Sequence, residues 1–211
     1  MQTDRVLGLF KFGQRQHVDQ LVRGRLYMNT LAHFVSVETN FARRDPREGQ
    51  SFWMQPDKVT LSIEVGGEFK PIPGIIGPIA YSHENELSAN VFCLYALRAS
   101  VAKRRIDPHN SEFGDTFAVF RDGDEFLRRV RDASKRTGLE VQWNVVEYVD
   151  EATYHGPMGI FRKSSEFSYQ SEFRIAVRPG TGSPYLLEVG DLSDLVLTGP
   201  MTELNERLKV D

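Results

Sequence analysis

The chain has 211 residues, of which 40% are hydrophobic and 26% are charged. These fractions are close to those of ordinary globular proteins, so they exclude a mainly disordered chain, a coiled coil and a collagen-like repeat. The net charge of −3 provides no overall basic field of the kind that attracts nucleic acid or anionic lipid. We expect a single domain over residues 1–211, with a hydrophobic core of its own.

Four short elements are predicted in the first forty residues. An apolar run with β-branched and aromatic side chains predicts a strand at 6–12, and an alternating pattern predicts another at 25–29. Between them, apolar residues three and four apart predict a helix at 14–23 that Gly24 would end. Thr30 is a typical N-cap for a further helix.

Strands dominate the rest of the chain. We expect strands at 59–65, 90–97, 116–120, 141–149, 172–177, 185–189 and 194–197, a helix capped by Asp122 or Asp124, and a terminal helix at 201–208. Gly66 and Gly67 fit a hairpin turn, whereas residues 40–57 are expected to be a loop and residues 71–81 an irregular or edge segment. Because short turns join most successive strands, the expected fold is α+β, with mixed, mainly antiparallel sheets flanked by short helices.

Several kinds of chemistry lack their motifs. The chain has no glycine-rich phosphate loop and no Gly-x-Ser-x-Gly elbow, and no two histidines have the spacing of metal ligands on one helix face. We therefore expect no metal site. Cys93 lies within an apolar strand, where an inert core residue is commoner than a nucleophile. Neither an export signal nor a membrane-spanning run is recognisable, so we expect a cytoplasmic protein with no membrane partner.

One stretch, residues 161–175, carries candidate chemistry. Residues 163–170 are expected to be a polar, serine-rich loop that leads into the strand at 172–177. Gln170 and Glu172 are two residues apart, so we expect both side chains on the same face of that strand. Glu172 suits the electrostatic stabilisation of an oxocarbenium-like centre, beside an amide that orients a sugar hydroxyl. The alternative is that Glu172 and Arg174 belong to a solvent-facing cross-strand ladder.

Gln170-Ser171-Glu172, preceded by an aromatic loop, resembles the Gln/Glu-x-Glu catalytic signature of the ADP-ribosyltransferase superfamily. Within it, the chain is similar to an uncharacterised bacterial family and, more distantly, to DNA-targeting bacterial toxin transferases. The resemblance covers most of the chain in short pieces. These are LFKFG at 9–13, LYMN at 26–29, RDPREG at 44–49, FRK at 161–163 and YQSEFR at 169–174.

The resemblance implies an ADP-ribosyltransferase-like fold and an enzyme that cleaves the nicotinamide–ribose bond of NAD, its co-substrate. It also implies that Glu172 and Gln170 are the catalytic residues. The residues implied to bind NAD are Lys11, Phe12, Gly13, Asn29, Tyr95 and Tyr169. The sequence departs from the family in two places, because Lys11 stands where a His or Arg is usual and the Ser-Thr-Ser motif of the middle strand is missing.

Two functions therefore remain open. The first is an ADP-ribosyltransferase or NAD glycohydrolase with a nucleic-acid or protein acceptor, in a bacterial or phage toxin or defence setting that could include an antitoxin-like partner. The second is a non-catalytic interaction module of a phage or defence system on the same scaffold. Convergence of Lys11, Gln170 and Glu172 on one cleft would favour the enzyme. Loop residues suited to a nucleic-acid acceptor are Arg43, Arg44, Arg47, Lys103, Arg104 and Arg105.

Overall fold

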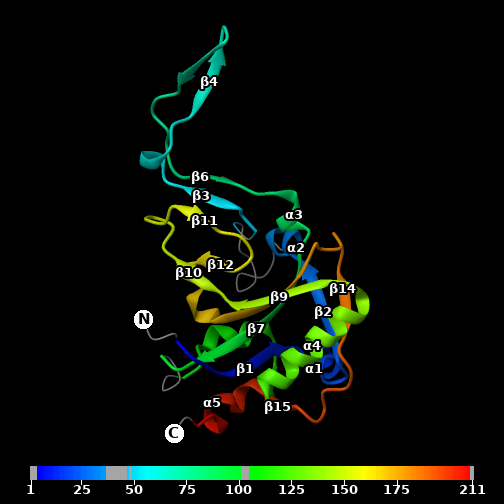
Figure 1. Ribbon diagram of the computed structural model, residues 1–211. Coiled ribbons are helices and arrows are strands. Elements are labelled where there is room, and N and C mark those ends of the chain that lie inside the picture. Colours follow the sequence, from blue (N-terminus) through cyan, green and yellow to red (C-terminus); the bar gives the residue numbers. More distant parts are fainter. Residues whose placement is uncertain (1–3, 37–46, 48, 101–104, 210–211) are drawn as a thin grey trace.

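The computed structural model describes residues 4–36, 47, 49–100 and 105–209 (Figure 1). Its fold is α+β, with mostly antiparallel sheets and few, short helices, as the sequence predicts. The strands are β1 (Val6–Gly13), β2 (Arg25–Thr30), β3 (Phe52–Met54), β4 (Ser62–Val65), β5 (Glu68–Pro71), β6 (Ile79–Tyr81), β7 (Asn90–Arg98), β8 (Thr116–Phe120), β9 (Glu140–Val145), β10 (Glu147–Val149), β11 (Gly156–Pro157), β12 (Arg162–Ser164), β13 (Glu172–Arg178), β14 (Tyr185–Glu188) and β15 (Val196–Pro200). The helices are α1 (Arg15–Val22), α2 (Leu31–Ser36), α3 (Glu84–Leu87), α4 (Gly123–Thr137) and α5 (Leu204–Arg207), and the 3₁₀ helices are η1 (Pro56–Lys58), η2 (Pro108–Phe113), η3 (Ser165–Gln170) and η4 (Met201–Glu203).

Strand β7 is the centre of the main sheet, and one of its edges is split. Along one edge, β7 pairs with β13 over residues 90–95. Along the opposite edge, β2 pairs only with residues 90 and 91, whereas β1 pairs with residues 95–98. Residues 92–94 have no paired strand on that edge among the described strands, so β1 and β2 diverge there. The divergence opens a gap in the sheet that side chains can line.

The two faces of the sheet pack into different cores. Helix α4 packs Phe126 and Val130 into the larger core, together with Leu21 of α1 and Ile175 of β13. The periodic apolar residues of α4 therefore serve as predicted, and its N-terminus is capped because the Asp122 side chain accepts the Glu125 N–H. A smaller cluster of aromatic and aliphatic side chains forms on the opposite face. It contains Phe10, Phe12, Tyr95, Leu97, Ile106, Phe117 and Leu204.

Most predicted elements are confirmed, and the exceptions have a common physical cause. The strand predicted at 141–149 is two strands, because the Val146 N–H turns to the carbonyl of Glu172 and β10 then pairs with β12 rather than with β13. The loop predicted at 163–170 is the end of β12 followed by η3. The edge segment predicted at 71–81 is confirmed, because β6 is an edge strand of the sheet β11-β3-β6. The third exception is the loop predicted at 40–57, whose described residues contain β3, which pairs with β6 and β11. In each case, a tertiary partner decides the local structure.

A hairpin of β4 and β5 projects away from the rest of the molecule (Figure 1). Its turn is Gly66–Gly67, as predicted, and both glycines have a positive φ, of 64° and 84°, which favours glycine. Within the described residues, β4 and β5 pair only with each other. The described helices include none whose length and apolar character would let it cross a bilayer.

Candidate functional site

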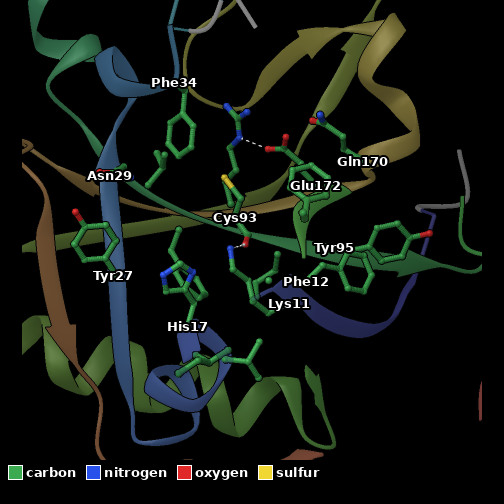
Figure 2. Close-up of a pocket in the computed structure, with 18 of the residues that line it drawn as sticks. Lys11, Phe12, His17, Tyr27, Asn29, Phe34, Cys93, Tyr95, Gln170 and Glu172 are labelled. Atoms are coloured by element: carbon green, nitrogen blue, oxygen red, sulfur yellow. Dashed lines mark hydrogen bonds and ion pairs between the residues drawn. The ribbon is translucent and has the colours of Figure 1, made fainter. Parts of the chain in front are cut away.

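A cavity of about 650 Å³ lies where β1 and β2 diverge from β7 (Figure 2). Side chains of β1, α1, β2, β7 and β13 line it, together with the end of η3. Its volume falls within the roughly 300–1,000 Å³ that is typical of small-molecule sites. The split in the sheet therefore produces a cavity of ligand size.

Almost all of the predicted site residues line this one cavity. The structure brings together Glu172, Gln170, Lys11, Phe12, Gly13, Asn29 and Tyr95. Tyr169 is the exception, because it lies beside the cavity wall in η3, with its ring 5.4 Å from the ring of His109. Its carbonyl accepts a hydrogen bond from the amide of Asn110, at 3.1 Å.

Gln170 and Glu172 come together for a different reason from the one that the sequence suggested. Gln170 ends η3, and Ser171 adopts the left-handed conformation (φ 41°) before Glu172 begins β13, so strand alternation does not relate the two side chains. Ser171 is held in this conformation by Ala96, which donates its N–H to the Ser171 carbonyl and accepts the Ser171 hydroxyl, both at 2.7 Å. The ammonium of Lys163 joins Gln170 to Glu172, with distances of 2.8 Å to Gln170 Oε1 and 3.0 Å to Glu172 Oε1.

Glu172 lies between two buried cations. Its Oε1 pairs with Lys163 Nζ at 3.0 Å. Its Oε2 accepts a hydrogen bond from Arg174 Nε at 2.6 Å, the dashed line at Glu172 in Figure 2. Lys163 and Arg174 are 4% and 1% exposed, and Glu172 is 7% exposed. A solvent-facing ladder of Glu172 and Arg174 is therefore excluded. A second anchor holds Arg174, whose Nη1 donates to the carbonyl of Ile160 at 2.6 Å.

These surroundings keep Glu172 ionised. Burial would raise the pKa of the Glu172 carboxyl, but the charges of Arg174 and Lys163 outweigh burial and hold that pKa well below its ordinary value. The Tyr148 hydroxyl accepts the backbone N–H of Glu172 at 2.9 Å. Burial, and next the charge of Glu172, raise the pKa of Tyr148 above its ordinary value, so this phenol stays neutral. The site thus holds a fixed carboxylate at neutral pH.

Lys11 reaches across the split in the sheet. Its ammonium donates to the carbonyl of Cys93 at 2.7 Å and lies 4.6 Å from the centre of the Phe92 ring (Figure 2). Cys93 itself is half-buried: it packs against the core cluster that contains Leu31 and Val91, as its strand suggested, and it also lines the cavity. Figure 2 shows the Cys93 sulfur on the cavity side of β7.

The wall of the cavity is cationic and aromatic. Among the described lining residues, Lys11, Arg25, Lys163 and Arg174 are cations, and Glu172 is the one acid. Basic side chains in a partly enclosed site attract anionic ligands. Flat aromatic faces for stacking come from Phe12, Tyr27, Phe34, Phe92, Tyr95 and Phe113.

The sequence did not assign several of these residues. Lys163 and Arg174 lie within the motif that carries the family resemblance, but the sequence indicated no role at the site for either of them. For Arg174, its position two residues after Glu172 on the same strand indicated that the two side chains share a face. His17, Tyr27 and Phe34 had no local signal, because their roles depend on how β2 and its flanking helices lie against β7. The four basic loop residues Arg43, Arg44, Lys103 and Arg104, and most of the loop at 44–49, lie outside the described residues.

Comparison of the chain with protein-family models, with curated proteins and with solved structures finds no match. The resemblance to the ADP-ribosyltransferase superfamily therefore rests on the sequence motifs, and the function has to be argued from the cavity. Within the described residues, no three side chains of His, Cys, Asp or Glu are grouped so that they could hold a metal ion.

Proposed function

We propose that this chain is an ADP-ribosyltransferase-like enzyme that cleaves the nicotinamide–ribose bond of NAD and passes ADP-ribose to a macromolecular acceptor or to water. The observation that carries the proposal is that Lys11, Gln170 and Glu172, which come from different elements, line one cavity of ligand size. This convergence is the feature that distinguishes the enzyme from a scaffold with dispersed polar residues. A toxin or defence role in the cytoplasm, with an antitoxin-like partner, is part of the same proposal.

The cavity suits the chemical character of NAD. NAD carries a diphosphate and two aromatic bases, and the described lining of the cavity combines basic with aromatic side chains. Lys11 on β1 would meet a phosphate as a point charge, in the position where the resembling family has a His or Arg. Asn29 on β2 would bind a ribose hydroxyl, and Tyr95 on β7 would stack on a base.

Glu172 would act by electrostatics rather than by covalent chemistry. As the bond to nicotinamide breaks and its electron pair leaves with the nicotinamide, the carboxylate would stabilise the positive charge that grows on the ribose. Each carboxylate oxygen can accept a further hydrogen bond besides its bond to Lys163 or Arg174, so a ribose hydroxyl can also be bound. Lys163 and Arg174 would be positioning residues that orient Glu172 and keep it ionised. Gln170 would position the acceptor, whose proton is released when it bonds to the ribose.

One observation favours a second candidate, the non-catalytic module. Both oxygens of Glu172 already contact a cation, as is expected of a carboxylate in a structural ion-pair cluster. Such a cluster can anchor an anionic ligand without any reaction. This candidate predicts no turnover of NAD, whether or not NAD is the ligand that binds.

Nicotinamide release from NAD, measured by chromatography beside NAD binding by calorimetry, tests the proposal. We expect release by the native protein and a loss of about 100-fold or more in Glu172→Gln, as for other electrostatic groups that act in the transition state. Asn29→Ala, which alters the cavity wall at a half-buried side chain, should weaken binding. The matched control Glu147→Gln makes the same chemical change in an exposed ion pair and should leave release unchanged.

The outcomes separate the two candidates. Binding of NAD without release, in a protein whose circular dichroism is native, would support the non-catalytic module and reject the enzyme. The absence of both binding and release would reject the enzyme and would leave the non-catalytic module, with a ligand other than NAD. The binding of nucleic acid weakens steeply as the salt concentration rises. If added nucleic acid changes nicotinamide release or NAD binding only at low salt, the acceptor is a nucleic acid.

A further inference from the structure

The projecting hairpin of β4 and β5 has one face with four aliphatic side chains and an opposite face that carries Ser62, Glu64, Phe69 and Pro71. The register pairs Ile63 with Lys70 and Val65 with Glu68, and the N–H of Ile72 bonds to the carbonyl of Leu61 at 2.8 Å. Side chains of directly opposed residues lie on the same face. The aliphatic face of the hairpin therefore consists of Leu61, Ile63, Val65, Glu68, Lys70 and Ile72.

This aliphatic face has no neighbour in the described chain. Ile63 and Val65 are 55% and 51% exposed, and Leu61 and Ile72 are exposed to a similar degree. An isolated two-stranded hairpin is marginally stable in water, and exposed apolar patches usually mark contact surfaces. The hairpin therefore lacks the packing partner that its own aliphatic face requires.

We infer that the partner is the same hairpin of a second copy of this chain, packed face to face in a symmetric dimer. The charges on the aliphatic face are the reason. A two-fold axis that crosses the strands between the pair Ile63–Lys70 and the pair Val65–Glu68 sets Glu68 opposite Lys70 of the second copy, twice. The same operation sets Val65 opposite Ile63 of the second copy, also twice.

The remaining positions fit the same axis. Leu61 and Ile72 then face the turn of the second copy, where Gly66 and Gly67 carry no side chain. A Cβ added at either glycine would have no neighbouring atom within 4 Å, so the turn leaves room for these two side chains. The other in-plane axis, along the strands, would set Glu68 opposite Val65 and Lys70 opposite Ile63, which buries charge against aliphatic side chains. The distribution of charge thus selects the antiparallel arrangement of the two hairpins.

The size of the contact sets its strength. Six side chains from each copy are fewer than the roughly 20–30 residues a side of a standard stable interface, so the dimer should dissociate on dilution. The inference does not depend on the proposed function, because the hairpin shares no residue with the cavity.

Sedimentation velocity of the full chain from about 1 to 300 μM tests this dimer. We expect a monomer at the lowest protein concentration and a dimer at the highest. The dissociation constant should be at least tenfold higher in Glu68→Lys and in Lys70→Glu. The control Glu64→Lys makes the same charge change on the opposite face of β4 and should leave the constant unchanged.

Two rescue experiments make the test specific. The double variant with both charges exchanged should recover the native constant, and so should an equal mixture of the two single variants, because each then finds its opposite charge across the axis. Recovery in the double variant but not in the mixture would mean that the charges act within one chain, and it would overturn the dimer. So would a protein that stays monomeric throughout, or single variants that associate like the native chain.

Discussion

Replacing Glu172 with glutamine removes one negative charge from between two buried cations and leaves the shape of the side chain almost unchanged. Lys163 and Arg174 would stay buried, at 4% and 1% exposure, after the loss of the Glu172 carboxylate. Breaking a buried ion pair by removing one partner typically costs about 3–5 kcal/mol of the free energy of unfolding. For a chain of this length, each kcal/mol lowers the melting temperature by about 2–4 °C, so we expect a decrease of about 6–20 °C.

Urea denaturation followed by circular dichroism measures this change, with Glu147→Gln as the control. Glu147 pairs with Arg162 at the surface, where the Glu147 side chain is 60% exposed, and a surface ion pair contributes about 0–1 kcal/mol. The two variants make the same chemical change, so the difference between them isolates burial. A loss of under about 1 kcal/mol in Glu172→Gln, or equal losses in both variants, would refute the argument that the charge of Glu172 stabilises the fold.

The pH dependence supplies an independent check of the same cluster. The folded pKa of Glu172 lies below its ordinary value because Arg174 and Lys163 outweigh its burial, so the stabilisation is complete above the pKa of an unfolded glutamate. It is lost as the pH falls from about 4.3 towards the folded pKa. Glutamine does not titrate, so the stability difference between the native protein and Glu172→Gln should shrink below that pH. A difference that is constant with pH would mean that Glu172 is not held ionised.

The remaining predictions concern a close backbone contact and the cation at the split. Gly24→Ala should destabilise the fold severely in a thermal melt, because its Cβ would lie 1.8 Å from the carbonyl oxygen of Gly190. The control Gly138→Ala has a similar positive φ but open space around it, so it should lower the free energy of unfolding by only about 1 kcal/mol. Equal losses in the two variants would show that the close contact does not matter. Lys11→Met should weaken the binding of ADP-ribose at least tenfold in calorimetry. The control Lys58→Met changes an exposed lysine of η1 and should leave binding unchanged. Unchanged binding in Lys11→Met would mean that Lys11 is not part of the binding site.

The local pattern of the sequence was sufficient for most of the fold. The central strand β7, the first strand β1 and the long helix α4 have clear periods and clear caps, so their existence follows from the residues themselves. The Gly66–Gly67 turn follows for the same reason, since the chain needs a positive φ at both positions. An α+β class with mostly antiparallel pairing then follows from the order and spacing of these elements.

The sequence also contained most of the candidate site, although not its geometry. Lys11, Gln170 and Glu172 were recognisable from a family resemblance, whereas the contact between Gln170 and Glu172 depends on the left-handed turn at Ser171 and on Lys163. No periodic pattern encodes such a turn, because the hydrogen bonds that stabilise it come from Ala96 on another strand.

The set of elements and their buried faces follow from the sequence, because periodicity, caps and turn residues act over a few positions. The divergence of β1 and β2 along one edge of β7, the cavity between them, and the place of Glu172 between Lys163 and Arg174 follow from the tertiary structure. The physical reason is that these features are contacts between residues far apart in the chain, where the cost of burying charge is balanced by partners that no local pattern specifies.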